Sequence, residues 1–220
     1  MDKFRLFSVA MLCAAGLTIT QCTTKDKDRF TPQSHDENIF MNIMHSSMDS
    51  MMTMKMTMDT DHDFALMMKL HHEGAVLMAD KVLSIGADTT IKRMATNIKN
   101  SQTGEIAQLN SFLASHKPVM EMVNNPKFMA ESDMAMDKMM ASNDLRPLTG
   151  KNDFDFAQLM VDHHQSAIEM AQSVLKYGDE PFTKNMATMV IEDQRKEIME
   201  FNAWMLKNRP YGNGGHSTHK

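Results

Sequence analysis

An internal repeat constrains this chain more than any other feature. The segment from Asp63 to Leu113 aligns without gaps with the segment from Asp155 to Met205, at a constant offset of 155 − 63 = 92 residues. About 20 of the 51 aligned positions are identical, including a pair of adjacent histidines in each copy. A gapless match over this length indicates an internal duplication. The chain is therefore predicted to contain the same structural unit twice.

Each copy predicts a hairpin of two long helices. Apolar residues recur every three or four positions, while Gly and Pro number only 9 and 6, a pattern typical of an all-α protein. The expected helices span residues 64–85, 90–115, 156–177 and 182–207. Asp61 or Asp63 is the expected N-cap of the first helix, and Gly86 and Gly178 are the expected stops. Two such hairpins predict an all-α, ferritin-like four-helix bundle over residues 61–207.

The segments outside the two repeats, 63–113 and 155–205, are expected to be less regular. The 114–154 linker is a long connection between the second and third helices, with a short Met-rich helix predicted to start near Pro126 and run through Ala141. Residues 22–60 are expected to form a Met-rich tether, in which 39–58 is either helical or disordered. Residues 208–220 are expected to be a flexible tail.

The N-terminus carries the pattern of an export signal. Two basic residues, Lys3 and Arg5, precede an apolar run that ends at Cys22, after which the chain turns polar. This pattern resembles a bacterial lipoprotein signal over residues 1–21, with Cys22 as the lipidated residue and Gln21 as a departure from the usual small residue. The expected location is the cell envelope, lipid-anchored to a membrane, or else secreted or periplasmic. Since Cys13 lies within the signal, the rest of the chain offers no cysteine pair for a metal site or disulfide.

A stripe of imidazoles, thioethers and alanines marks the first helix of each copy. Histidine and methionine recur at helical spacing on one face, where an ordinary bundle would carry Leu and Ile. Imidazole is the commonest protein metal ligand, and thioether sulfur selects soft ions such as Cu(I). The predicted metal ligands are Met68, His71, His72 and Met78 in the first copy and Met160, His163, His164 and Met170 in the second.

The second helix of each copy adds polar residues to its own apolar stripe. Gln102 and Glu105, with Gln194 and Glu197 in the other copy, are expected to orient the imidazoles from behind the ligands. If all these groups face the bundle axis, they converge near a pseudo-twofold centre, where burial without partners would cost several kcal/mol each. The alternative is a polar layer in which the glutamates accept from the imidazoles and no ion binds.

Methionines outside the repeats predict accessory soft-metal sites. The chain contains 27 methionines, far more than core packing normally uses, and they cluster ahead of the first repeat. Closely spaced thioethers can surround Cu(I) or Ag(I), although soft packing in a helix would explain them too. The accessory ligands are expected among Met44, His45, Met48, Met51, Met52, Met54, Met56 and Met58. For the run from Met134 to Met140, helix packing explains the pattern nearly as well. His216 and His219 are more simply part of a solvated tail.

The doubled histidine pattern resembles a known family. The motif Asp-Phe-Ala-x-x-Met-x-x-His-His-x-x-Ala-x-x-Met-Ala, followed by Gln-x-x-Glu-Ile, occurs in both copies. It is similar to the bacterial family known as domain of unknown function 305, which includes CopM-like copper-binding proteins of the envelope. The resemblance covers about residues 61–207 and implies a ferritin-like fold with copper binding or tolerance.

Several functions remain open at this level. The favoured one is extracytoplasmic binding of copper, chiefly Cu(I) and possibly Ag(I), for sequestration, tolerance or delivery. A di-iron or di-manganese redox enzyme is the alternative, but the Glu-x-x-His motif that such centres use is missing from the sequence. A metal-free structural or partner-binding bundle and a haem protein are further alternatives.

The net charge and the missing catalytic motifs argue against a nucleic-acid partner and against an enzymatic activity. The formal net charge of −5 gives no basic footprint for nucleic acid. No nucleophile elbow or phosphate loop occurs, so the chain is expected not to be an enzyme. The expected partners are metal ions and a membrane, with a homo-oligomer or a copper-handling protein as further possibilities.

Overall fold

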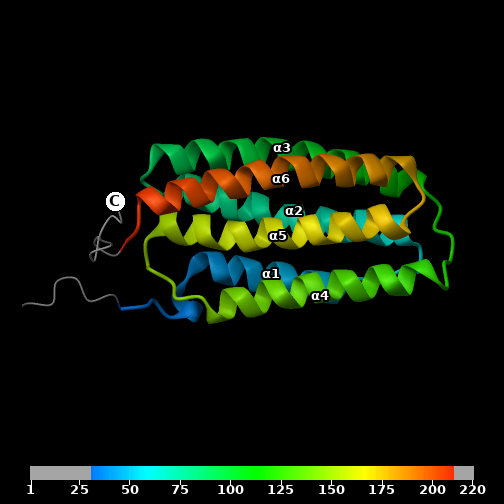
Figure 1. Cartoon of the computed structure of the whole chain (residues 1–220), viewed down its shortest axis with the longest axis horizontal. Helices are drawn as coiled ribbons and strands as arrows, with labels where there is room; N and C mark the ends of the chain where they lie inside the picture. Colours follow the sequence, from blue (N-terminus) through cyan, green and yellow to red (C-terminus); the bar gives the residue numbers. More distant parts are fainter. Residues whose placement is uncertain (1–30, 211–220) are drawn as a thin grey trace, which may run out of the picture.

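The computed structural model describes residues 31–210 and consists of long helices (Figure 1). The predicted signal, Cys22, His216 and His219 lie outside the described residues. A short 3₁₀ turn, His35–Glu37, precedes six α-helices. They are α1 (Ile39–Met52), α2 (Thr60–Ile85), α3 (Thr89–Ser115), α4 (Asn124–Leu145), α5 (Asn152–Tyr177) and α6 (Pro181–Lys207). The prediction of an all-α bundle is confirmed.

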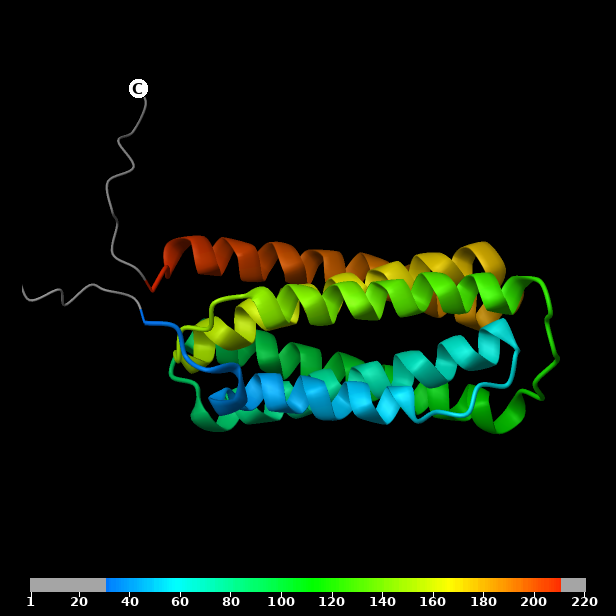
Figure 2. The same cartoon turned by 90° about the horizontal axis from the view of Figure 1, so that it is seen from below.

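The helices form three layers of two (Figures 1 and 2). The middle layer contains α2 and α5, which pack against each other. On one side α3 packs on α2 and α6 on α5, while on the other side α1 packs on α2 and α4 on α5. The connection from α3 to α4 crosses one end of the bundle from the α3/α6 layer to the α1/α4 layer. The four helices expected from the repeat are therefore present, and α1 and α4 add a third layer.

Residues 39–52, which the sequence left open between helix and disorder, form α1. Its N-cap Asn38 accepts hydrogen bonds from the backbone N–H groups of Phe40 and Met41, and Phe40, Met41, Met44 and Met51 are buried. The helix therefore contributes to the core of the bundle.

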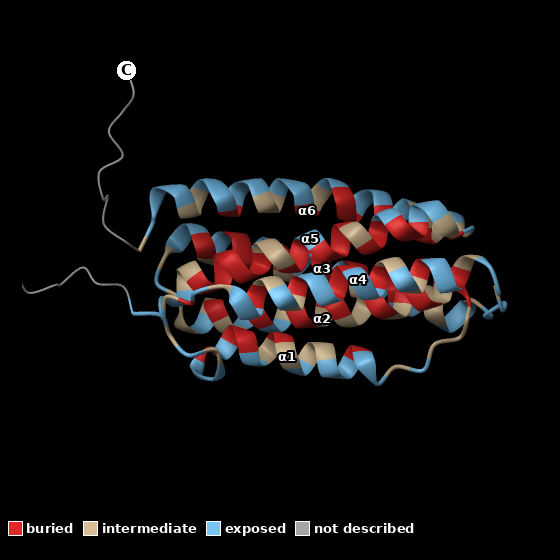
Figure 3. Ribbon diagram, turned by 60° about the horizontal axis from the view of Figure 1, so that its bottom comes forward, coloured by how far each residue is buried: buried red, intermediate tan, exposed pale blue. Residues whose placement is uncertain are grey.

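Small and soft side chains fill the middle layer. Red stripes of buried residues run along the facing sides of the helices in Figure 3. Ala75 and Ala79 of α2 and Ala167 and Ala171 of α5 are fully buried, and α2 packs against α5. Because an alanine projects so little, it allows two helix backbones to approach closely. Methionine and phenylalanine then supply most of the larger buried volume.

The first turn of α2 differs from the prediction. Its N-cap is Asp59, whose carboxylate accepts the backbone N–H of His62, and not Asp61 or Asp63. Asp61 instead accepts the N–H groups of Asp179 and Glu180, in the turn between α5 and α6. The equivalent Asp153 of α5 accepts the N–H groups of the turn between α2 and α3. Each hairpin turn is thus held by a carboxylate from the other hairpin.

The predicted helix stops, Gly86 and Gly178, leave no room for a side chain. A Cβ atom at Gly178 would lie 2.6 Å from Asp61 Oδ1 and 2.9 Å from the Val174 carbonyl oxygen. We expect Gly178→Ala to lower the free energy of unfolding by about 1–3 kcal/mol, because the new methyl group would push the turn after α5 away from the Asp61 carboxylate. Urea unfolding measures this loss. Gly104→Ala in α3, where a Cβ meets nothing, is the matched control and should raise stability by about 0.5–1 kcal/mol. Equal effects at the two glycines would contradict the prediction.

Within residues 31–210, every helix is too short or too polar to cross a lipid bilayer.

Candidate metal centre

The two histidine pairs lie midway along the middle-layer helices. Consecutive residues of an α-helix point about 100° apart, so the two rings of a pair cannot face the same neighbour. His71 and His163 face each other and the α1/α4 layer, whereas His72 and His164 each lie against a glutamate from the α3/α6 layer. The structure therefore divides the predicted centre into a shared part and two separate parts.

The shared part is a stacked pair of imidazoles. The ring centroids of His71 and His163 are 3.7 Å apart with an angle of 35° between the planes, and both residues are almost fully buried. Burial, followed by the nearby histidines of both pairs, holds the pKa of each ring well below its ordinary value. Both imidazoles are therefore neutral at neutral pH, the protonation state in which a ring nitrogen can bind a metal.

Hydrogen bonding indicates which nitrogen of His71 is free. The Ser166 hydroxyl donates to the His163 carbonyl oxygen at 2.7 Å and lies 2.9 Å from His71 Nε2. Because the single hydroxyl proton of Ser166 is used in the bond to His163, the proton between Ser166 Oγ and His71 must belong to the imidazole. His71 Nε2 therefore donates to Ser166 Oγ. His71 Nδ1 then carries a free lone pair, and neither His71 Nδ1 nor His163 Nδ1 has a hydrogen-bond partner among the described residues.

The two halves of the centre are not identical. At the position equivalent to Ser166, α2 has Gly74, whose missing side chain allows Ser47 of α1 to approach. A Cβ atom on Gly74 would lie 2.8 Å from Ser47 Oγ and 3.7 Å from His163 Nε2. Helix α1 therefore packs close to His163, while Ser166 holds His71 in place.

The separate parts are two histidine–glutamate pairs. His72 Nε2 lies 2.7 Å from Glu105 Oε2, and His164 Nε2 lies 2.9 Å from Glu197 Oε2. The contacts are close, but they are too bent to count as hydrogen bonds through the ring N–H. Both rings are fully buried, Glu105 is buried as well, and Glu197 is partly exposed. Each glutamate thus lies beside the second histidine of its own hairpin.

Several buried polar atoms around the histidines lack partners. The side-chain amides of Gln102 and Gln194 are buried, and neither their oxygen nor their nitrogen atoms form a hydrogen bond with the described residues. Leaving such a group unpaired costs about 1–3 kcal/mol. An unpaired polar layer of this size calls for water or an ion, and the neutral imidazoles with free nitrogens fit a metal ion.

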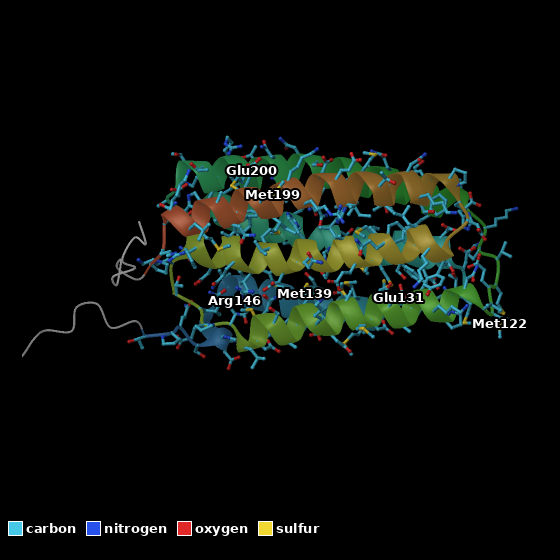
Figure 4. The ribbon with its side chains drawn as sticks, viewed as in Figure 1. Met122, Glu131, Met139, Arg146, Met199 and Glu200 are labelled. Carbon is cyan, nitrogen blue, oxygen red and sulfur yellow. The ribbon has the colours of Figure 1, made fainter. Side chains whose placement is uncertain are left out.

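Methionine sulfur reaches the stacked pair from the α1/α4 layer. A small cavity of about 10 Å³ touches His71 and His163 and is also lined by Met44, Met48, Met51 and Met139. Met139, labelled on α4 in Figure 4, places its sulfur 3.2 Å from the Ser166 hydroxyl oxygen. Its place beside the centre could not be recognised from the Met134–Met140 run alone.

The methionines of the repeat stripe take a different place. Met68, Met78, Met160 and Met170 are all fully buried, but they do not line the cavity that touches the stacked imidazoles. Within residues 31–210, no three His, Cys, Asp or Glu side chains converge to hold a metal ion. A metal at this centre would therefore combine imidazole nitrogen with methionine sulfur.

The predicted accessory ligands are spread over α1 and the loop that follows it. Met44 and Met51 are buried, Met52 is 75% exposed, and Met48, Met54 and Met56 are partly buried around one groove. His45 is turned outward, with Nε2 3.2 Å from Asp144 Oδ1. The described interaction of Met58 is made by its backbone: the residue has a positive φ of 68°, and its N–H donates to Asp63.

Comparison with known proteins identifies the family. The family described as domain of unknown function DUF305 matches residues 61–205, from the first turn of α2 almost to the end of α6. This chain belongs to the DUF305 family. The match begins after α1, so the methionines of α1 lie outside the part of the chain that defines a DUF305 protein.

Solved structures share the DUF305 fold at low sequence identity. A DUF305 protein of Streptomyces coelicolor, described as secreted, has 23% identity and a TM-score of 0.55, covering 74% of this chain and 100% of its own. A DUF305 fragment from Deinococcus radiodurans has 23% identity and a TM-score of 0.50, with 67% and 96% covered. The copper(II)-bound form of CopM has 24% identity and a TM-score of 0.51, also with 67% and 96% covered. No protein with a curated function matches the sequence.

Proposed function

We propose that this DUF305 protein binds soft metal ions, copper(I) before others, outside the cytoplasm. The observation that carries the proposal is the stacked pair His71–His163, neutral and buried, with unpartnered Nδ1 atoms beside a cavity lined by methionine sulfur. Neutral imidazole and thioether together favour Cu(I) and Ag(I) over hard cations such as Mg²⁺. The Cu(II)-bound structure of CopM, which has the same fold, supports copper as the metal, whereas the preference for Cu(I) rests on the sulfur and imidazole donors.

The residues of the centre have distinct roles in the proposal. The imidazoles of His71 and His163 bind the ion, and Met44, Met48, Met51 or Met139 complete its coordination. Ser166 fixes the tautomer and orientation of His71. Glu105 and Glu197 hold His72 and His164, which supply either further ligands or the electrostatic surroundings of the ion. Binding without turnover suits sequestration or delivery, and lipidation at Cys22 would hold the protein at a membrane of the envelope.

Competition with a chromogenic Cu(I) chelator tests this function. Purified protein should take Cu(I) from the chelator without oxygen and should prefer it to Zn(II) and Fe(II). Changing His71, His72, His163 and His164 together to Ala should weaken the tightest site by at least about 100-fold, because ligands are lost outright. His35→Ala is the matched control, since its Nε2 bonds only the Arg146 carbonyl, and it should leave the affinity unchanged. If the quadruple variant holds as much Cu(I) as the unaltered protein, the proposed centre is wrong.

A further inference from the structure

A methionine-lined groove opens between α1 and α4. It has a volume of about 430 Å³, and its lining consists of eight methionines and two aspartates. Met48 and Met51 come from α1, Met54 and Met56 from the loop that follows, and Met67 from α2. Helix α4 supplies the opposite wall. Figure 2 shows these two outer helices side by side along the bundle. The groove is therefore built from segments far apart in the sequence.

The groove and the small cavity at the stacked imidazoles share lining residues. Met48 and Met51 line both spaces, so one side of each methionine faces the groove and another faces the cavity with His71 and His163. The cavity volume of about 10 Å³ leaves room for no more than roughly one water molecule or one ion. Because a thioether can turn about three side-chain bonds, Met48 and Met51 are able to present sulfur on either side.

The mouth of the groove carries negative charge. Asp133 and Asp137 lie one turn apart on α4, both exposed, and neither forms an ion pair with any residue between 31 and 210. Two unpaired carboxylates at the rim of a small groove attract cations and disfavour the burial of an apolar partner helix. The negative charge therefore favours a cation as the occupant of the groove over an apolar protein surface.

We propose that this groove is the uptake site for the soft cation and passes it inward to His71 and His163. The ion first binds thioether sulfurs in the groove and then moves by ligand exchange, in which Met48 and Met51 keep hold of it while imidazole nitrogens replace the outer sulfurs. No electron or proton needs to move, because thioethers and neutral imidazoles bind without losing a proton. Transfer of the ion to His71 and His163 rests on the proposed function, whereas binding of the ion in the groove does not.

Silver(I) is the probe of choice, because it does not change oxidation state in air. The full protein, labelled with ¹³C at the methionine methyl groups and ¹⁵N in the imidazoles, is followed by NMR as Ag(I) is added. We expect the methyl signals of Met48, Met51, Met54 and Met56 to shift, while those of Met122 and Met199 stay in place. The last two lie at one end of the bundle and on α6 (Figure 4) and are 69% and 64% exposed. Unshifted groove signals would overturn the proposal without any variant being made.

The rate of loading tests the direction of transfer. Met54→Leu with Met56→Leu keeps the side-chain volume but removes two of the eight groove sulfurs and none from the small cavity. This variant should slow the appearance of the shifted imidazole signals at least about tenfold while leaving their final position unchanged. Met122→Leu with Met199→Leu is the matched control and should load at the original rate. Equal rates in both variants would overturn the uptake role.

The two proposals fail in different ways. If the imidazoles never shift while the groove methyl signals do, the proposed His centre is wrong but the groove still binds the cation. If the imidazoles shift at the same rate with or without the sulfurs of Met54 and Met56, the centre stands and the uptake route is wrong.

Discussion

Acidification from about pH 7.5 to about pH 5 is expected to lower the free energy of unfolding by up to about 4 kcal/mol. The stacked imidazoles of His71 and His163 are the cause, because burial and their histidine neighbours hold each pKa well below its ordinary value. In the unfolded chain both rings take up a proton near pH 6.5, while in the folded protein they stay neutral. Stability is therefore complete above about pH 6.5 and falls as the pH decreases, by about 1.4 kcal/mol per pH unit for each ring.

Urea unfolding at a series of pH values measures this dependence. A double variant, His71→Gln with His163→Gln, removes both titrating rings and should flatten the curve between about pH 7 and pH 5. His35→Gln, at a half-buried position outside the bundle core, should leave the slope as it is. If the double variant loses stability in parallel with the unaltered protein, the acid sensitivity arises from other groups. Bound Ag(I) should raise the stability and leave the slope in place, because the folded imidazoles carry no proton in either case and the unfolded chain still takes protons up.

The hairpins could be predicted from the sequence because their signals are local. Apolar residues at helical spacing and a glycine at the same place in both copies mark where helices run and end, and the observed boundaries agree within four residues. The N-cap was placed wrongly because three aspartates lie within five residues of one another. Asp61 binds the distant turn between α5 and α6, and Asp63 binds the loop just before α2 together with Asn125 of α4. The distant contacts leave no local signal.

The third layer could not be predicted in the same way. Methionine fills a buried helix face and a loose metal-binding tract equally well, so its abundance in residues 39–58 favoured neither. What commits residues 39–52 to α1 is tertiary structure. Gly74 leaves space for Ser47, and Asn38 donates a hydrogen bond to Asp155. Both interactions join segments that are far apart in the sequence, so the spacing of apolar residues within one helix does not predict them.

The histidine stripe was visible in the sequence, but the arrangement of its members was not. Because neighbouring residues on a helix diverge by about 100°, the pair His71-His72 had to divide between two faces. The sulfurs that reach the stacked imidazoles come from α1 and α4, and the stripe methionines of α2 and α5 line other parts of the core. Which sulfur meets which imidazole depends on helix packing, and packing is set by small residues such as Gly74.

The largest effect on folding is expected from the aspartates at the start of α2 and α5. Asp63 accepts the N–H groups of Thr57 (2.8 Å) and Met58 (3.1 Å) and the side-chain amide of Asn125 (2.9 Å). Its counterpart Asp155 accepts the N–H groups of Thr149 (2.8 Å) and Gly150 (2.9 Å) and the side-chain amide of Asn38 (3.1 Å). Burial raises the pKa of the Asp155 carboxyl, and these hydrogen bonds offset part of that cost.

Replacing either aspartate by Ala should lower the free energy of unfolding by about 3–5 kcal/mol, because several buried donors lose their acceptor at once. Asp80→Ala, which removes an exposed partner of Lys99, is the matched control and should cost no more than about 1 kcal/mol. Since Asn38 begins α1 and Asn125 lies in the first turn of α4, each aspartate also holds the outer helix of the opposite repeat. Asp155→Ala should therefore speed amide hydrogen exchange in α1 before it does so in α4, and Asp63→Ala should do the reverse. Uniform exchange in both variants would show that the outer layer does not depend on these carboxylates.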